Sequence, residues 1–261
     1  MLVPAESRAA TLSSGGIAVS AGGTPAATYE WASAYDRIAT AATHAASGRA
    51  PADRIRRAIN VTLALTALLL CLPLIIVIGF LIKLTSPGPI LYTQARVGVD
   101  RRNDGDAVPD GRRVVDYGGR LFRIYKFRTM YVSPGDAPQT WAKRDDPRVT
   151  PIGRILRKYR LDELPQLYNV LRGDMNLVGP RPEQPRIFAL LRDQIPNYEL
   201  RQRVLPGITG LAQVNQAYDT SMDDVRRKVR FDLEYIARRS AFEDLRIMFM
   251  TLPALIKKRG W

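Results

Sequence analysis

The hydrophobic pattern is dominated by one long apolar segment, residues 58–82, in which no side chain is charged. A continuous helix of that length would be roughly 37 Å long, which exceeds a bilayer core of about 30 Å. Pro73 lies near the middle, where proline removes a helix hydrogen bond and clashes with the carbonyl group four residues earlier. The pattern predicts a membrane helix that bends at Pro73, with arms of about 22 Å and 15 Å that are each too short to cross alone.

Basic residues flank the apolar segment on both sides, so the positive-inside rule favours neither end as the outer one. They are Arg49, Arg54, Arg56 and Arg57 before the segment and Lys83, Arg96, Arg101 and Arg102 after it. A central proline between cationic flanks is explained most simply by a re-entrant helix-hairpin, with both ends in the cytoplasm. A single kinked span with its N-terminus outside is the alternative.

The polar and apolar positions after residue 150 predict two shorter helices. The first begins at Pro151 after Thr150, because proline at the first helical position gives up only an amide without a helical partner. Spacing by three and four residues gives this helix an apolar face and a cationic face. The apolar face holds Ile152, Ile155 and Leu156, and the cationic face holds Arg154, Arg157 and Lys158.

The second helix spans the apolar positions from Leu161 to Leu171 and ends at Gly173, with Asp162 at or next to its N-cap. One interpretation is that Asp162 only caps the helix, a role worth about 0.5–2 kcal/mol. The other rests on neighbouring cations, which with a helix N-terminus favour phosphate: Arg157, Lys158 and Arg160. In such a site one carboxylate can attack phosphorus while its neighbour, Glu163, holds a divalent cation.

The residue inventory favours the same chemistry. The only histidine is His44 and the only cysteine is Cys71, so one copy of the chain cannot form a Ser-His-Asp triad, a Cys-His pair or a His/Cys zinc site. Carboxylates, basic side chains and a hard metal such as Mg²⁺ remain, which are the means of phosphoryl transfer. No P-loop motif is present.

The composition shows a strong excess of positive charge and an N-terminal segment of small residues. The net charge of +14 and the pI near 10.2 predict attraction to anionic membrane lipids and to phosphates. Basic chains also bind nucleic acids, but no nucleic-acid module is recognisable and the apolar segment argues against one. Residues 1–50, rich in Ala, Ser, Gly and Thr, are expected to form a disordered or weakly helical tail.

Four linked motifs follow in order: LTSPGPILYTQARVG, IYKFRTM (124–130), LDELPQLYNVLRGDMNLVGPRPE and PGITGLAQVN (206–215). In these motifs the chain resembles the bacterial sugar transferases, the monotopic phosphoglycosyl transferases that act on polyprenyl phosphate. The resemblance implies an α+β fold: a re-entrant membrane helix-hairpin over residues 51–86, then a small cytoplasmic α/β domain over 87–261. That domain would contain a β-hairpin and interfacial amphipathic helices, on the inner membrane of a bacterium.

The resemblance also implies a reaction, the transfer of sugar 1-phosphate from a nucleoside diphosphate sugar, typically a UDP-sugar, to polyprenyl (undecaprenyl) phosphate with release of UMP. This step would initiate exopolysaccharide, O-antigen or glycoconjugate synthesis. Asp162 would be the nucleophile and Glu163 would help to hold Mg²⁺. The substrate-binding residues carried over from the motifs are Arg157, Arg181, Lys126, Arg128 and Gln213.

Several alternatives remain open. A strand over residues 121–130 would explain Lys126 and Arg128 as a solvated face opposite packed Tyr125 and Phe127. The C-terminal helix, with a Ser240–Glu243 capping box, has an apolar stripe that fits either the membrane interface or the core: Leu245, Met248, Phe249 and Leu252. The insertion at 99–119 is expected to be a long hairpin tip without a catalytic role. A membrane-anchored basic scaffold is the alternative to an enzyme, and the sequence leaves homo-oligomerisation open.

Overall fold

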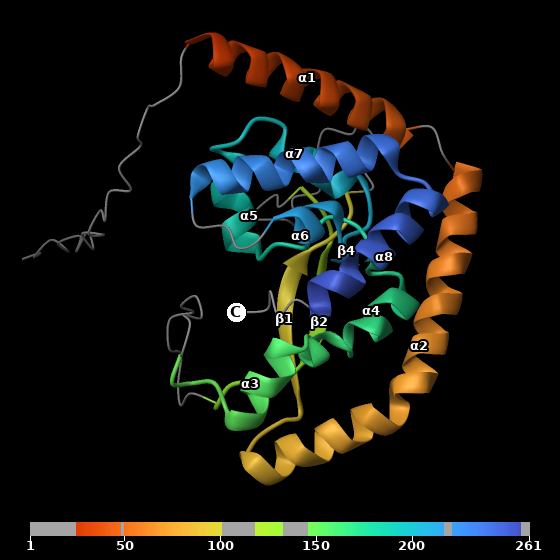
Figure 1. Cartoon of the computed structure of the whole chain (residues 1–261), viewed down its shortest axis with the longest axis vertical. Helices are drawn as coiled ribbons and strands as arrows, with labels where there is room; N and C mark the ends of the chain where they lie inside the picture. The colour runs from red at the N-terminus through yellow and green to blue at the C-terminus, as the bar shows by residue number, and fades with distance from the viewer. Residues whose placement is uncertain (1–24, 48–49, 101–117, 133–145, 217–220, 257–261) are drawn as a thin grey trace, which may run out of the picture.

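The computed structural model describes residues 25–47, 50–100, 118–132, 146–216 and 221–256. In chain order the described elements are α1 (Pro25–Ser47), α2 (Ala50–Thr85), β1 (Leu91–Val97), β2 (Leu121–Phe127), α3 (Pro151–Lys158), the 3₁₀ turn η1 (Leu161–Glu163), α4 (Gln166–Arg172), β3 (Asn176–Val178), α5 (Pro185–Arg192), the 3₁₀ helix η2 (Tyr198–Arg203), β4 (Gly207–Thr209), α6 (Leu211–Asn215), α7 (Met222–Arg238) and α8 (Ala241–Ile256). Helices predominate around two small two-stranded sheets (Figure 1), which confirms the mixed α and β class.

The apolar segment forms helix α2, whose residues 52–85 are long and apolar enough to cross a membrane by length and composition. Pro73 lies inside α2, and Figure 1 shows the helix bent into two arms. The predicted bend is confirmed, because proline cannot supply the hydrogen bond that would keep the helix straight. Large apolar side chains of both arms face outward, including Leu70 and Phe80. Re-entrant placement with both ends in the cytoplasm stays a prediction.

The first arm of α2 is fastened to the rest of the protein by polar side chains near its start. Arg57 donates hydrogen bonds to the carbonyl oxygens of Val170 and Met175, at the end of α4 and just beyond it. Asn60 accepts a hydrogen bond of 2.6 Å from the backbone amide of Leu177 in β3. Helix α2 is therefore joined to the segment that follows the acid pair.

Strands β1 and β2 form an antiparallel hairpin in which Leu91 pairs with Phe127 and Val97 with Leu121. The predicted strand is confirmed through Phe127, but its solvated-face interpretation is wrong. Phe127 is buried as expected, but Phe122 and Ile124 are buried too, and by alternation Lys126 lies on their face. Lys126 is half-buried and Arg128, just past the strand, is buried. Most of the insertion between the strands, residues 101–117, lies outside the described residues.

Of the two expectations for the tail over residues 1–50, disordered or weakly helical, disorder is wrong for Pro25–Ser47, which form α1 along α7 (Figure 1). Tyr35, Ala39 and Ala42 are buried in the main core with side chains of α7. The Tyr35 hydroxyl donates a 2.6 Å hydrogen bond to the carbonyl oxygen of Pro196. The alanines repeat at helical spacing, so a composition that suggests low complexity also provides a flat surface for close helix packing. Residues 1–24 lie outside the described part of the chain.

Helix α8 packs against the protein with a largely different face from the predicted apolar stripe. Ile247 and Asp244 are buried, whereas the predicted stripe is largely exposed, with Phe249 62% and Leu252 54% exposed. Met248 is partly buried against the main core, so the core-packing alternative holds for this residue and is wrong for Leu245, Phe249 and Leu252. The placement of the stripe at a membrane interface remains a prediction. The Ser240 hydroxyl accepts a hydrogen bond from the Glu243 amide, as expected for the N-cap.

Helix α3 packs so closely on the loop after β2 that one position requires glycine. A Cβ atom on Gly153 would lie 2.1 Å from the backbone oxygen of Thr129. Alanine is the better helix former by about 1 kcal/mol, but overpacking costs about 1–3 kcal/mol and should prevail here. We expect Gly153→Ala to lower the thermal unfolding midpoint in detergent. The control is Gly79→Ala in α2, whose Cβ would make an ordinary 3.5 Å contact with Ile90. An unchanged midpoint for Gly153→Ala would contradict the close packing.

Candidate active site

Helix α3 begins as predicted and brings Arg157 to the site. The Thr150 hydroxyl accepts a 2.9 Å hydrogen bond from the Gly153 amide, and Pro151 is the first helical residue. Leu156 is fully buried, but Ile155 is 52% exposed, so the predicted apolar face is only partly a packing face. In the last turn, Arg157 Nε donates to the hydroxyl of Thr129 at 2.9 Å.

The acid pair does not lie where the sequence places it. Asp162 and Glu163 belong to the separate 3₁₀ turn η1, and α4 starts only at Gln166 with Pro165 as its N-cap. The prediction that Asp162 caps a longer helix is therefore wrong, because Pro165 breaks the apolar pattern into a turn and a helix. Gly173, with φ of 89°, ends α4 as expected. Arg160 has a φ of 52°, a left-handed conformation that is costly for a non-glycine residue and often marks functional sites.

Glu163 is the centre of a buried cationic cluster. Its Oε1 accepts hydrogen bonds of 2.8 Å from Lys126 Nζ and of 2.8 Å from Arg181 Nη2. Arg160 Nη1 lies 3.8 Å from Oε2. Burial alone would raise the pKa of Glu163, but these three cations outweigh burial and hold the pKa well below its ordinary value. Glu163 is therefore ionised, and it organises the cations around it.

Asp162 differs from its neighbour because its carboxylate has no direct hydrogen bond or ion pair with any residue in the described ranges. It is half-buried beside the same cations. Burial and then the Glu163 charge raise the pKa of Asp162, while Lys126, Arg157 and Arg181 oppose the rise. The site thus contains one fully engaged carboxylate and one that is accessible and unoccupied by protein donors.

The backbone of Arg181 is positioned by a network of charged residues that the sequence argument did not select. Arg201 donates from Nη2 to the carbonyl oxygen of Arg181 at 3.0 Å and from Nε to Asp232 Oδ2 at 2.7 Å. Glu183 accepts a 2.7 Å hydrogen bond from Lys228. Arg201, Glu183 and Asp232 are all buried. A relay of buried charges therefore runs from α7 to the Pro-Arg-Pro segment and on to Glu163.

Arg96 of β1 is a further residue that the sequence argument used only as a membrane flank. Its Nη1 donates to the carbonyl oxygen of Pro182 at 3.0 Å. Burial and the neighbouring Arg181 lower its pKa, and Glu183 and Glu163 partly offset them.

Two of the predicted substrate-binding residues lie outside the cluster. Arg128 is buried and donates to Ser86 and to the carbonyl oxygen of Pro87, at the end of α2. The Gln213 side chain donates to the carbonyl oxygen of Ile208. The structure therefore brings together Asp162, Glu163, Arg157, Lys126 and Arg181, whereas Arg128 joins the end of α2 to the β1–β2 hairpin.

Glu183 makes the stability of this relay depend on pH. Lys228 and Arg201 overcome the effect of burial and lower the pKa of Glu183 from 4.5 to about 2. A lowered pKa contributes stability that is complete above the unfolded value and is lost as the pH falls towards the folded value. The shift corresponds to roughly 3 kcal/mol.

We therefore expect Glu183→Gln to be less stable than the unsubstituted protein by roughly 3 kcal/mol near pH 6, with the difference shrinking between about pH 4.5 and pH 2. Thermal unfolding in detergent at several pH values measures this difference. Glu199→Gln is the control, because Glu199 is exposed. A difference that does not change with pH would contradict the assignment.

The comparison with known proteins identifies the family of the chain. The family model described as bacterial sugar transferase matches residues 52–258, and the chain belongs to this family. It is 40% identical over 206 residues to the UDP-N-acetylgalactosamine-undecaprenyl-phosphate N-acetylgalactosaminephosphotransferase of Aeromonas hydrophila, covering 79% of this chain and 44% of that protein. It is 39% identical over 200 residues to the UDP-glucose:undecaprenyl-phosphate glucose-1-phosphate transferase of Escherichia coli (strain K12), covering 76% and 39%.

A relative of closer length is the exopolysaccharide production protein ExoY of Rhizobium meliloti (strain 1021), 36% identical over 221 residues that cover 78% of this chain and 87% of that protein. The chain therefore spans less than half of the Aeromonas and Escherichia relatives and most of the Rhizobium one. Helix α1 lies before the matched family region.

Proposed function

We propose that the protein transfers sugar 1-phosphate from a UDP-sugar to undecaprenyl phosphate, through a covalent intermediate on Asp162. The observation that carries the proposal is the difference between the two acids. Glu163 accepts hydrogen bonds from Lys126 and Arg181, whereas Asp162 lies beside the same cations without a direct hydrogen bond in the described ranges. The relatives' names, which specify sugar phosphate transfer to undecaprenyl phosphate, support the same reaction.

In the first step an Asp162 carboxylate oxygen attacks the donor phosphorus that bears the sugar. A new oxygen–phosphorus bond forms, the bond to the bridging diphosphate oxygen breaks, and UMP leaves with that electron pair. In the second step a phosphate oxygen of undecaprenyl phosphate attacks the same phosphorus and releases Asp162. No proton is consumed overall, and the products are UMP and undecaprenyl diphosphate sugar.

The cationic side chains would supply electrostatic stabilisation during both steps. Arg157, Lys126 and Arg181 lie near enough to influence the charge of Asp162, so they can also stabilise the negative charge that spreads over the phosphoryl oxygens. Arg181 is fixed by Arg201 and Glu163, which makes it a preorganised group rather than a mobile one.

Glu163 would also provide an oxygen for Mg²⁺ when the ion is bound. The described residues contain no cluster of three His, Cys, Asp or Glu side chains. Mg²⁺ commonly binds through one or two carboxylates together with substrate phosphates and water. Glu163 Oε2, which lies at the long distance of 3.8 Å from Arg160 Nη1, and the adjacent Asp162 fit that pattern. A bound Mg²⁺ would neutralise donor phosphate charge.

We place the protein in the bacterial inner membrane with the acid pair facing the cytoplasm, where nucleotide sugars are soluble. Both ends of α2 would lie on that side. Cysteines introduced at Ala41 and Asp193, which are exposed, in a Cys71→Ser background should be protected from an impermeant reagent in intact cells. Labelling of the Ala41 position alone would show a spanning helix.

The reaction is tested by UMP release from a panel of UDP-sugars with undecaprenyl phosphate in detergent. One donor should give multiple turnovers with the acceptor and no more than one UMP per protein without it, because the enzyme cannot be regenerated. The panel also identifies the sugar. Absence of UMP with every donor would favour the scaffold alternative and overturn the proposal.

A further inference from the structure

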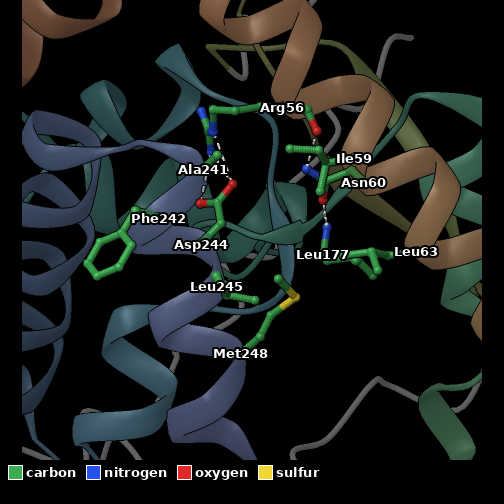
Figure 2. Close-up of a pocket in the computed structure, with 10 residues that line it drawn as sticks. All are labelled: Arg56, Ile59, Asn60, Leu63, Leu177, Ala241, Phe242, Asp244, Leu245 and Met248. Carbon is green, nitrogen blue, oxygen red and sulfur yellow. Dashed lines mark hydrogen bonds and ion pairs between the residues drawn. The ribbon is translucent and has the colours of Figure 1, made fainter.

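A groove runs along the crease between the first arm of α2 and helix α8, away from the acid pair. It encloses a cavity of about 260 Å³, and Figure 2 shows Leu63 of α2 on one side with Leu245 and Met248 of α8 on the other. Ile59 and Phe242 also line it, and Leu177 of β3 is the remaining apolar contributor. The volume is just below the range of small-molecule sites, so it suits one slender chain rather than a bulky ligand.

The polar groups in this groove are already satisfied by protein partners. Arg56 makes hydrogen bonds to Asp244 at 2.8–3.0 Å and donates to the Tyr235 hydroxyl at 2.7 Å. Asn60 donates to the carbonyl oxygen of Arg56 and accepts from the Leu177 amide. An occupant of the groove therefore meets apolar walls and no unmatched donor or acceptor, which favours a hydrocarbon chain.

A second cavity of about 600 Å³ continues the crease at the start of α2 and forms its polar end, because four of its lining residues are charged. It shares Arg56 and Ala241 with the apolar groove. Its charged lining side chains are Arg56, Arg238 and Arg239 against Asp53, and Arg239 is paired with Asp53 at 2.9 Å. Arg238 is exposed and has no ion pair within the described part of the chain. This end of the crease carries excess positive charge and one available guanidinium.

We propose that this crease is a binding site for one anionic phospholipid, with an acyl chain between α2 and α8 and the phosphate at Arg238. From Ala52 to Leu63 the crease is about 16 Å long, close to the roughly 15 Å of hydrocarbon in one leaflet. Its polar end faces the start of α2 and its apolar end faces the Pro73 bend. That direction matches headgroups above and acyl chains below, given the membrane placement that the proposed function assumes.

The test is native mass spectrometry of the delipidated full chain in detergent, titrated with phosphatidylglycerol. The unsubstituted protein should retain one molecule. Leu63→Trp fills the groove and should weaken retention at least about tenfold, because the acyl chain loses its apolar contacts. Leu65→Trp is the matched control, since Leu65 is comparably exposed, at 45% against 39%, but does not line the groove. Equal retention by Leu63→Trp and Leu65→Trp would overturn the site.

The polar end is tested by Arg238→Gln, which should weaken phosphatidylglycerol retention about fivefold and remove its preference over phosphatidylcholine. The control is Arg186→Gln on α5, an exposed arginine outside the crease. Equal retention of the two lipids by the unsubstituted protein would mean ordinary detergent-belt lipid and would refute the proposal. So would displacement of phosphatidylglycerol by equimolar undecaprenyl phosphate, which would assign the groove to the acceptor.

Two measurements separate this inference from the proposed function. Asp162→Asn should retain phosphatidylglycerol unchanged, because the crease shares no lining residue with the acid pair. Met248→Trp, which fills the groove from α8, guards against misfolding of a single variant and should reproduce the Leu63→Trp result. Leu63→Trp and Met248→Trp should still release one UMP per protein from donor alone, since that step needs no lipid. If these variants lose both UMP release and lipid retention, they are unfolded, which would contradict the proposed local effect.

Discussion

Replacing Asp162 with asparagine is expected to reduce turnover by at least about a thousandfold, because the amide cannot form the covalent bond to phosphorus. The substitution changes little else, since Asp162 makes no direct hydrogen bond or ion pair within the described ranges. It also removes the charge that Glu163 opposes, so folding stability should be unchanged or slightly higher. Steady-state UMP release, measured alongside thermal unfolding, separates the two effects.

The control for this variant is Asp193→Asn, because Asp193 is an exposed aspartate at the end of α5. It should keep full turnover. Turnover of Asp162→Asn within a few-fold of the unsubstituted protein, at equal stability, would show that another group receives the phosphosugar. A general loss of folding in Asp162→Asn would contradict the structural isolation of this carboxylate.

The second large effect is expected for Arg201→Met, which removes the buried centre of the charge relay. Arg201 bonds Asp232, the Tyr198 hydroxyl and the Arg181 carbonyl oxygen, with its side chain 1% exposed. Removing one partner of such a pair leaves an uncompensated buried charge and costs about 3–5 kcal/mol. We expect a correspondingly lower unfolding midpoint, and a fall in activity because Arg181 loses its support.

The matched control is Arg226→Met, in which the lost ion pair, to Asp223 at 2.9 Å, is exposed. Exposed pairs contribute about 0–1 kcal/mol, so this variant should be nearly as stable as the unsubstituted protein. Adding Asp232→Leu to Arg201→Met should recover part of the lost stability, since the stranded carboxylate is removed. Equal effects of Arg201→Met and Arg226→Met would contradict the relay.

Much of the fold could be predicted because its signals are local. Pro73 sets the bend of α2, Thr150 and Pro151 set the start of α3, and the left-handed conformation at Gly173 ends α4. Such features depend on a few neighbouring residues. The N-terminal tail could not be predicted in this way, because α1 is stabilised by contacts with α7, about 190 residues later in the chain.

The same distinction between local and long-range signals applies to the candidate site. The sequence identified the acid pair and the cations that meet it, since they lie in short, dense motifs. It missed Arg201, Glu183 and Asp232, whose roles come from long-range pairing in a buried network. It also assigned Arg128 to substrate, whereas the Arg128 side chain donates hydrogen bonds to the carbonyl oxygens of Ser86 and Pro87. A basic residue in a motif indicates that a cation is needed, but only packing shows which anion or carbonyl it meets.

The central claim is that Asp162 accepts the phosphosugar, and intact-protein mass spectrometry after incubation with the active UDP-sugar alone tests it most directly. The account predicts an added mass equal to the sugar phosphate minus water, located by peptide mapping to residue 162 and absent from Asp162→Asn. An adduct on another residue, or its persistence in Asp162→Asn, would contradict the account.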